Sequence, residues 1–123
     1  ITPSLKDVNS GEAQRYAVKN VVETMVGMLA AGVYTIDVQP LFLVETGDVL
    51  FIDFTEASRF SRPPSPSEES AMVGFCSEMR VLIPDSLRDE AKDRLIAELD
   101  VLRTKEAFLP EKVVDILESV WID

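Results

Sequence analysis

The sequence contains no histidine and only one cysteine, Cys76. Without histidine the chain cannot form a Ser-His-Asp or Cys-His catalytic group, a two-histidine iron site or an HExxH zinc site. A single cysteine also excludes an internal disulfide and a cysteine-rich zinc site. No apolar run approaches the roughly 18 residues that a membrane-spanning helix needs, so none is predicted. These absences exclude most histidine-dependent and cysteine-dependent enzyme classes.

Basic side chains are scarce, because 12 Lys and Arg stand against 22 Asp and Glu, a net charge of −10. Binding to phosphates relies on concentrated Lys and Arg, so this balance argues against nucleic acid and membrane as partners. The hydrophobic fraction of 46% and the charged fraction of 28% are ordinary for a soluble globular protein. At this length the chain is expected to form a single domain, residues 1–123.

The beginning of the chain and its cysteine usage carry the only signals about location. The sequence starts Ile1-Thr2-Pro3 instead of with methionine, and no signal-peptide pattern follows. This start predicts a processed product or an excised domain. The lack of paired cysteines favours an intracellular setting.

The N-terminal part of the chain shows a helical pattern. Apolar side chains recur at helical spacing from Tyr16 to Leu29, and Gly32 follows where a left-handed C-cap is expected. Asn9 and Ser10 are both suitable N-caps. We therefore predict a helix over residues 11–30, with its apolar stripe packed against the rest of the fold.

Two short runs of strand-forming residues come next, at 41–44 and 49–52. Gly47, in the segment that joins them, supplies the positive φ that a tight hairpin loop needs. Both runs are apolar at nearly every position. The sequence therefore predicts a β-hairpin that is covered on both faces.

Residues 58–67 contain three prolines within four positions, which predicts an irregular, proline-rich surface loop. A peptide-docking motif and a phosphorylated segment are alternative interpretations of this loop. Helical patterns then run from Ser67 to near Leu82, from Pro84 to about residue 104, and from Pro110 onward. The predicted fold class is α+β and mostly helical: an N-terminal helix, a β-hairpin, a proline-rich loop and three helices.

Two of these helical patterns carry side chains that invite a functional interpretation. Cys76 lies on an apolar stripe beside Met72 and Met79, so it is expected in the core instead of acting as a nucleophile. Trp121 and Phe108 could anchor an interface. The favoured interpretation is a C-terminal helix that docks its aromatic side chain into the core.

Two aspartates stand at positions that suggest chemistry. Asp37 follows the exit of the first helix, and Asp53 lies at the end of the second strand, within an apolar stretch. Burying such a carboxylate is costly unless it is hydrogen-bonded, paired or bound to a metal. Because the hairpin folds the chain back, the two aspartates are expected to approach each other, as a minimal phosphoryl-transfer site would need.

The residues around these aspartates resemble the C-terminal lobe of the protein-kinase-like fold, with the match covering residues 15–57. Residues 32–44 look like the catalytic loop, in which a helix ends in glycine and a β-branched residue before the catalytic aspartate. Residues 47–57 look like the strand that leads into the Asp-Phe-Gly motif. The resemblance implies Asp37 as catalytic base, Asp53 as Mg²⁺ ligand, and Mg²⁺ and ATP as cofactors.

The departures from that family imply a degenerate, pseudokinase-type lobe. Thr35 and Ile36 stand where His and Arg would precede the aspartate, Phe42 replaces the metal-binding Asn, and Thr55 replaces the glycine of Asp-Phe-Gly. The chain also has no glycine-rich loop and no material for an N-terminal lobe. The resemblance therefore implies a lobe that is not catalytic alone, and a phosphotransferase only if a missing N-lobe completes it.

Ordinary structural roles stay open for both aspartates. Asp37 could cap the turn into the hairpin, since Asp side chains commonly accept from nearby backbone amides. Asp53 could pair with Arg59, Arg62 or Arg80. In either case the carboxylates would carry no chemistry.

Two functions follow from the sequence, and both involve another protein chain as partner. The first is a kinase-like scaffold or regulatory module. The second is a small acidic binding protein, such as an immunity protein, an inhibitor or a secretion chaperone, that covers a basic partner. The motif pattern favours the first, and the net charge favours the second, because such a field steers association with a cationic target.

Overall fold

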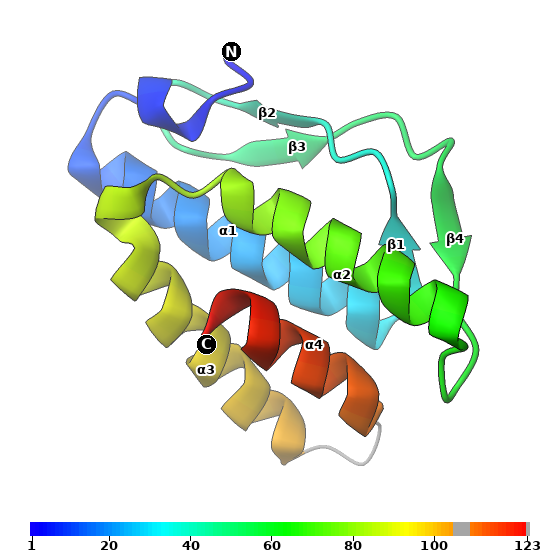
Figure 1. The fold of residues 1–123 in the computed structure, drawn as a ribbon. Coiled ribbons are helices and arrows are strands. Elements are labelled where there is room, and N and C mark those ends of the chain that lie inside the picture. The colour runs from blue at the N-terminus through cyan, green and yellow to red at the C-terminus, as the bar shows by residue number, and fades with distance from the viewer. Residues whose placement is uncertain (105–108, 123) are drawn as a thin grey trace.

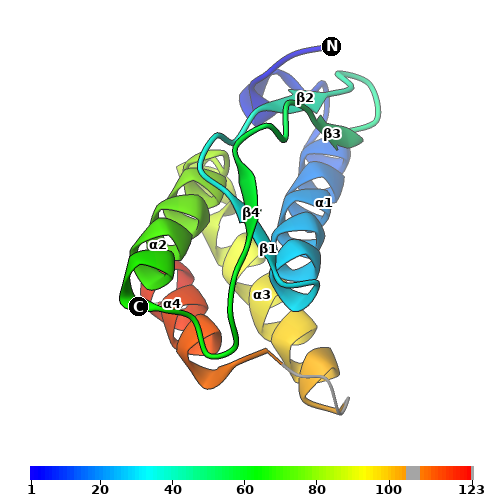
Figure 2. The same cartoon turned by 90° about the vertical axis from the view of Figure 1, so that its right-hand side faces the viewer.

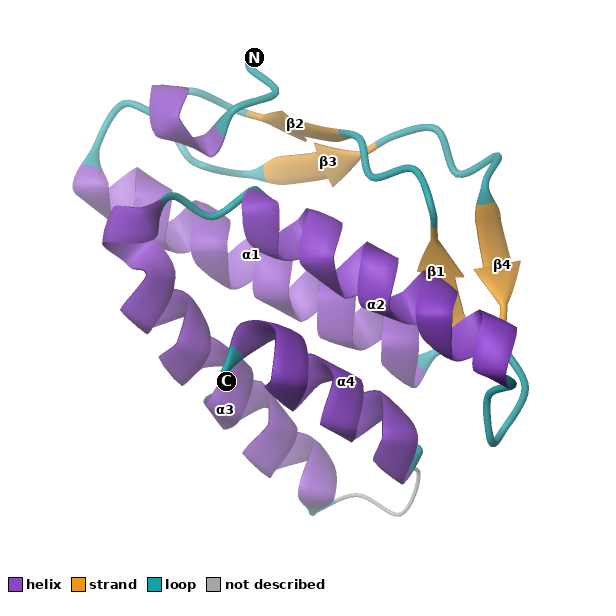
Figure 3. Cartoon of the chain, in the orientation of Figure 1, coloured by secondary structure: helices purple, strands orange, loops and turns teal. Residues whose placement is uncertain are grey.

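In the described part of the chain, four α-helices form the body and four short strands cover one side of it (Figures 1 and 3). The computed structural model describes residues 1–104 and 109–122. Its described strands form two small antiparallel sheets, each with two strands. The predicted α+β, mostly helical fold class is confirmed.

Helix α1 (Gly11–Ala30) has the bounds that the sequence predicts. Ser10 is its N-cap, because its hydroxyl accepts a hydrogen bond from the backbone N–H of Ala13 at 3.1 Å. Gly32 follows the C-terminus at φ +83°, in the left-handed region where glycine is favoured. The expectation that Tyr16 belongs to the buried stripe is wrong, since it is 43% exposed. It lies two positions before buried Val18, which places it on the opposite side of the helix.

Residues 33–59 fold back on themselves and form two ladders, an inner ladder next to the turn and an outer ladder at the two ends of the segment. β2 (Pro40–Phe42) pairs with β3 (Val49–Phe51), which confirms the predicted hairpin. β1 (Val33–Thr35) pairs with β4 (Ala57–Arg59), a ladder that the sequence analysis does not predict. The pairing is interrupted between the two ladders, where residues 36–39 lie opposite residues 52–56.

The inner ladder is covered on one face only, so the prediction of two covered faces is wrong. Phe42 is fully buried, whereas Leu50 on the opposite face of the same ladder is 64% exposed. Side chains alternate between the faces of a strand, so a two-stranded hairpin needs a second layer to cover both. The described part of the chain supplies only the layer formed by the helices.

Gly47 holds the hairpin turn against α1. Its φ is +80°, and a Cβ at this position would collide with the backbone carbonyl of Ala13. The side-chain amide of Asn20 also donates to the Gly47 carbonyl oxygen, at 3.5 Å. The turn is therefore packed directly on the first two turns of the helix.

The irregular proline-rich segment is shorter than the predicted loop of residues 58–67. Ser58 and Arg59 belong to β4, and helix α2 (Pro66–Val81) begins before the predicted start at Ser67. The N-cap is Ser65, which forms a capping box with Glu68, and proline is well tolerated in the first turn that follows. The irregular part is reduced to residues 60–65.

The last two helices complete two packed pairs. α3 (Arg88–Arg103) follows a short 3-10 turn, Asp85–Leu87, and α4 (Glu111–Trp121) follows Pro110. α1 packs on α3, and α2 packs on α4. β1 contacts both α1 and α2 and lies between them in Figure 2. Of the predicted core residues, Cys76 and Trp121 are buried, and Phe108 lies outside the described residues.

Candidate functional site

Asp37 and Asp53 meet at the interruption between the two ladders, as the folded-back hairpin predicts. The link between them is Gln39, whose side-chain Nε2 donates to Asp37 Oδ2 at 2.7 Å and to Asp53 Oδ2 at 3.3 Å. One amide nitrogen therefore bridges the two carboxylates. The sequence analysis does not identify Gln39 as a site residue.

Asp53 is exposed, which corrects the expectation that its carboxylate is embedded in apolar surroundings. Its backbone is left-handed at φ 59°, and its Oδ1 accepts from the Thr55 hydroxyl at 2.6 Å and from the Thr55 backbone N–H at 3.4 Å. These bonds, the hydroxyl first, lower the pKa of the Asp53 carboxyl. An Asx-type turn of this kind accounts for the aspartate without any metal.

The arginines proposed as partners of Asp53 do not take that role in the described residues. Arg62 instead donates from Nη2 to the Ala30 carbonyl oxygen, at 3.0 Å, near the end of α1. The partners of the Asp53 carboxylate are Thr55 and Gln39.

Asp37 is half-buried, and the side chain of Thr35, two residues before it, caps its backbone N–H. The Thr35 hydroxyl accepts from the Asp37 backbone N–H at 3.2 Å, so the threonine and not the aspartate closes this turn. The next residue, Val38, donates its backbone N–H to Glu78 Oε2 on α2, at 3.2 Å. The second contact holds the segment between the two ladders against helix α2.

The surface hollow beside Asp37 does not include Asp53. Asp37 borders this shallow hollow with Val38 and the end of α2. Within residues 1–104 and 109–122, no group of three His, Cys, Asp or Glu side chains is placed to hold a metal ion. The roles of Asp37 as base and Asp53 as magnesium ligand therefore stay predictions.

A patch of apolar side chains lies next to the bridged aspartates, on the outer side of the inner ladder. The strand register pairs Leu41 with Leu50, and the two-residue period places Leu43 and Ile52 on the same face. We call these four residues the hairpin face. Leu43, Leu50 and Ile52 are all exposed, and Phe54 beyond the strand end is exposed as well.

The surroundings of the hairpin face carry charge of one sign. No Lys or Arg occurs between Asn20 and Ser58. The carboxylates in the strand region are Asp37, Glu45, Asp48, Asp53 and Glu56. Asp48 stands at the turn end of the hairpin face, and the bridged aspartates stand at its other end. An apolar surface bounded by carboxylates at both ends is suited to a cationic partner with an apolar centre.

Cys76 is not a reactive group. Its side chain is fully buried in α2, and desolvation raises the pKa of the thiol to about 12. A thiol that stays protonated at neutral pH is a poor nucleophile. The sequence-based expectation of a core cysteine is confirmed.

Among the described helices, none combines the length and the apolar character that crossing a bilayer would need. Comparisons with protein-family models, with curated proteins and with solved structures found no match to this chain.

Proposed function

We propose that this chain is a kinase-like C-lobe that acts as a protein-interaction scaffold and is not catalytic alone. The observation that carries the proposal is the hairpin face, an apolar surface of Leu41, Leu43, Leu50 and Ile52 set between two groups of carboxylates. The order of elements supports the kinase-like part. A helix, a glycine turn, an aspartate, a hairpin and a second aspartate follow one another, and the aspartates meet in space.

The bridging amide supports a role without catalysis. Gln39 Nε2 donates to one oxygen of Asp37 and to one of Asp53, and these are oxygens that a divalent cation would need. Thr55 donates to the other oxygen of Asp53. Each of these bonds stabilises the local turn in the absence of a cation. In this role the two aspartates stabilise the backbone of the two segments that face each other between the ladders.

The partner that fits the hairpin face is a basic protein segment with an apolar centre. Contiguous apolar surface on a single domain commonly marks an interaction site. The apolar side chains would supply the buried area, and the carboxylates at both ends would steer and orient Lys or Arg on the partner. Steering by exposed charges of this kind weakens as salt screens them.

The second candidate, a small acidic binding protein of another class, uses the same surface. The absence of Lys and Arg from Asn20 to Ser58 favours it. In both candidates the aspartates are structural, whereas a phosphotransferase would need them to bind nucleotide and magnesium. A test of the surface and a test of the aspartates are therefore made separately.

The surface is tested with a labelled synthetic peptide that has an apolar centre and lysine pairs at both ends, followed by fluorescence anisotropy. We expect saturable binding that weakens with salt. The double variant Leu50→Ser, Ile52→Ser should weaken it by at least about tenfold, since burying each side chain is worth roughly 1.5–3 kcal/mol. The matched control is Ile96→Ser, which changes an exposed apolar residue on α3. Equal binding by the double variant and the control would contradict the assignment of the surface.

The aspartates are tested by calorimetric titration of the chain with ATP and Mg²⁺, beside the variant Asp53→Ala. The scaffold proposal predicts no heat of binding from either protein. Magnesium-dependent binding that is lost in the variant would contradict it and favour a phosphotransferase, with Asp37 as base and Asp53 as metal ligand.

A further inference from the structure

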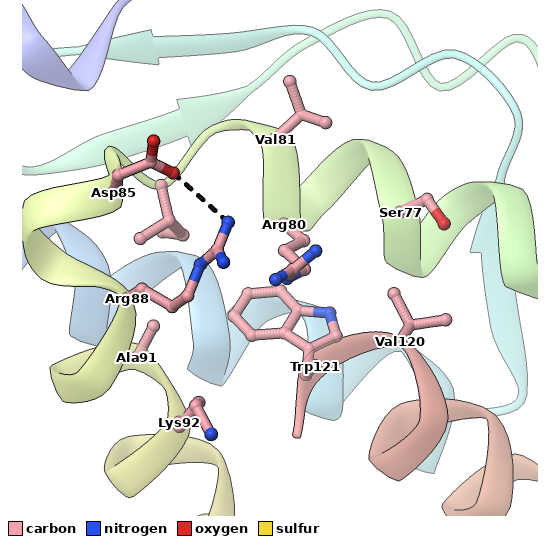
Figure 4. A pocket seen from close by; sticks show the side chains of 10 residues that line it. Ser77, Arg80, Val81, Asp85, Arg88, Ala91, Lys92, Val120 and Trp121 are labelled. Carbon is pink, nitrogen blue, oxygen red and sulfur yellow. Dashed lines mark hydrogen bonds and ion pairs between the residues drawn. The ribbon is translucent and has the colours of Figure 1, made fainter. Parts of the chain in front are cut away.

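A cavity of about 330 Å³ lies between the C-terminal end of α2, the start of α3 and the end of α4 (Figure 4). Its volume is at the lower end of the range typical of small-molecule sites. Arg80 reaches it from α2, Arg88 and Lys92 reach it from α3, and Trp121 of α4 lies between them. The cavity is distinct from the hairpin face and its carboxylates.

The cavity is positively charged in a strongly acidic protein. Three of the 12 basic side chains line it against one carboxylate, Asp85, so the lining carries a net charge of +2. Arg88 Nη2 is paired with Asp85 Oδ1 at 3.2 Å. In the part of the chain that the structure describes, the side chains of Arg80 and Lys92 make no hydrogen bond or ion pair. Two cations are therefore left for a ligand, although the protein has ten more acids than bases.

The remaining walls of the cavity are mostly apolar. They are formed by Val81, Ile83, Ala91, Val120 and Trp121. In Figure 4 the Arg80 side chain lies beside the Trp121 ring, and the Arg88 side chain points to Asp85. A ligand in this cavity would meet guanidinium groups on one side and apolar side chains on the other.

We propose that this cavity binds a small phosphate monoester with an apolar body. A phosphoryl group carries about −1.5 to −2 charges near neutral pH, which matches the net charge of the lining, and offers three acceptor oxygens. Guanidinium groups bind such oxygens through paired N–H donors. The hydroxyl of Ser77, which also lines the cavity, is a further donor. The apolar body of the ligand would pack against Val120 and Trp121.

The test uses the only tryptophan of the chain as its reporter. Trp121 lines the cavity, so ligand entry changes its fluorescence. We expect phenyl phosphate to give a saturable change, inorganic phosphate to bind at least about tenfold more weakly, and phenol to give no saturable change. Arg80→Gln and Lys92→Gln should each weaken phenyl phosphate by about tenfold or more, as the loss of a hydrogen bond to a charged group does. The matched control, Arg15→Gln, should bind like the parent chain.

Three outcomes would overturn the proposal. The first is the absence of a saturable change with phenyl phosphate up to about 10 mM, about ten times the dissociation constant that a binding free energy of roughly −4 kcal/mol gives. The second is an equal effect of Arg80→Gln, Lys92→Gln and Arg15→Gln, which would show that only net charge matters. The third is phenol binding as tightly as phenyl phosphate, which would leave an apolar cavity without anion recognition. Because Lys92 is a surface residue of α3, its variant decides the test if Arg80→Gln does not fold.

Discussion

The indole N–H of Trp121 donates a hydrogen bond to the backbone carbonyl oxygen of Cys76, at 3.0 Å in the buried interior. This bond joins the last helix to the middle of α2 across 45 positions of sequence. Trp121 is 2% exposed, so it packs into the core as the sequence predicts. The C-terminal helix is thus joined to α2 by this buried hydrogen bond, and also by the ion pair between Lys112 and Glu69.

Replacing Trp121 by phenylalanine should lower the free energy of unfolding by about 1–3 kcal/mol. The variant loses one buried hydrogen bond and part of the buried ring volume. The Cys76 carbonyl oxygen keeps its backbone partner within α2. Urea denaturation followed by circular dichroism measures the loss. A change smaller than about 0.5 kcal/mol would show that α4 does not depend on this contact.

The two faces of the inner ladder should respond differently to truncation. Phe42→Ala removes a fully buried ring and should cost about 3–5 kcal/mol in the free energy of unfolding. Leu50→Ala, on the hairpin face, should change stability by no more than about 0.5 kcal/mol, because its side chain is largely exposed. Parallel chemical denaturation of both variants checks this. Similar losses in the two variants would mean that another layer covers the hairpin face.

The Cys76 thiol should resist modification in the folded protein. Burial raises its pKa to about 12, so at pH 8 only on the order of one molecule in ten thousand carries the reactive thiolate. Labelling with a disulfide reagent should be more than about a hundredfold slower than in guanidinium, where the chain is unfolded. Rapid labelling without denaturant would show that α2 opens locally.

Glu68 should make stability depend on pH in the acid range. The Ser61 hydroxyl, and after it the Ser65 backbone N–H, lower the pKa of the Glu68 carboxyl from 4.5 to about 2. A carboxyl with a lowered folded pKa contributes stability that is fully present above the unfolded value and is lost as the pH falls. The stability difference between the parent chain and Glu68→Gln should therefore shrink between pH 4.5 and 2.

The matched variant for this effect is Ser61→Ala, which removes the largest cause of the lowered pKa. It should leave the chain with a weaker pH dependence over the same range. If the parent chain and Glu68→Gln lose stability in parallel from pH 4.5 to 2, the capping box does not act through this carboxylate.

The helices could be predicted because their signals are local. Ser10 and Gly32 bound α1 through bonds and dihedral angles that involve only neighbouring residues. The predicted start of α2 at Ser67 is wrong although its signal is also local: Ser65 and Glu68 have the spacing of a capping box, and Pro66 occupies the first helical position.

The sheet and the site were only partly predictable, because tertiary pairing determines them. β4 consists of Ala57, Ser58 and Arg59, which show no apolar alternation, so nothing in its sequence indicates a strand. Leu50 and Phe51 are both apolar, and only the position of α1 decides which of them is covered. Gln39 owes its role to two carboxylates that the fold brings within reach of its amide.

Gly47 limits how relatives of this chain can diverge. Any side chain at this position collides with α1, and Gly32 is held by its left-handed backbone at the other end of the same segment. Leu50 and Ile52 are exposed and carry no such packing constraint, so only a role in binding would keep them apolar. In a relative that keeps both glycines but has polar residues on the outer side of the hairpin, the fold would be retained while the proposed binding surface is lost.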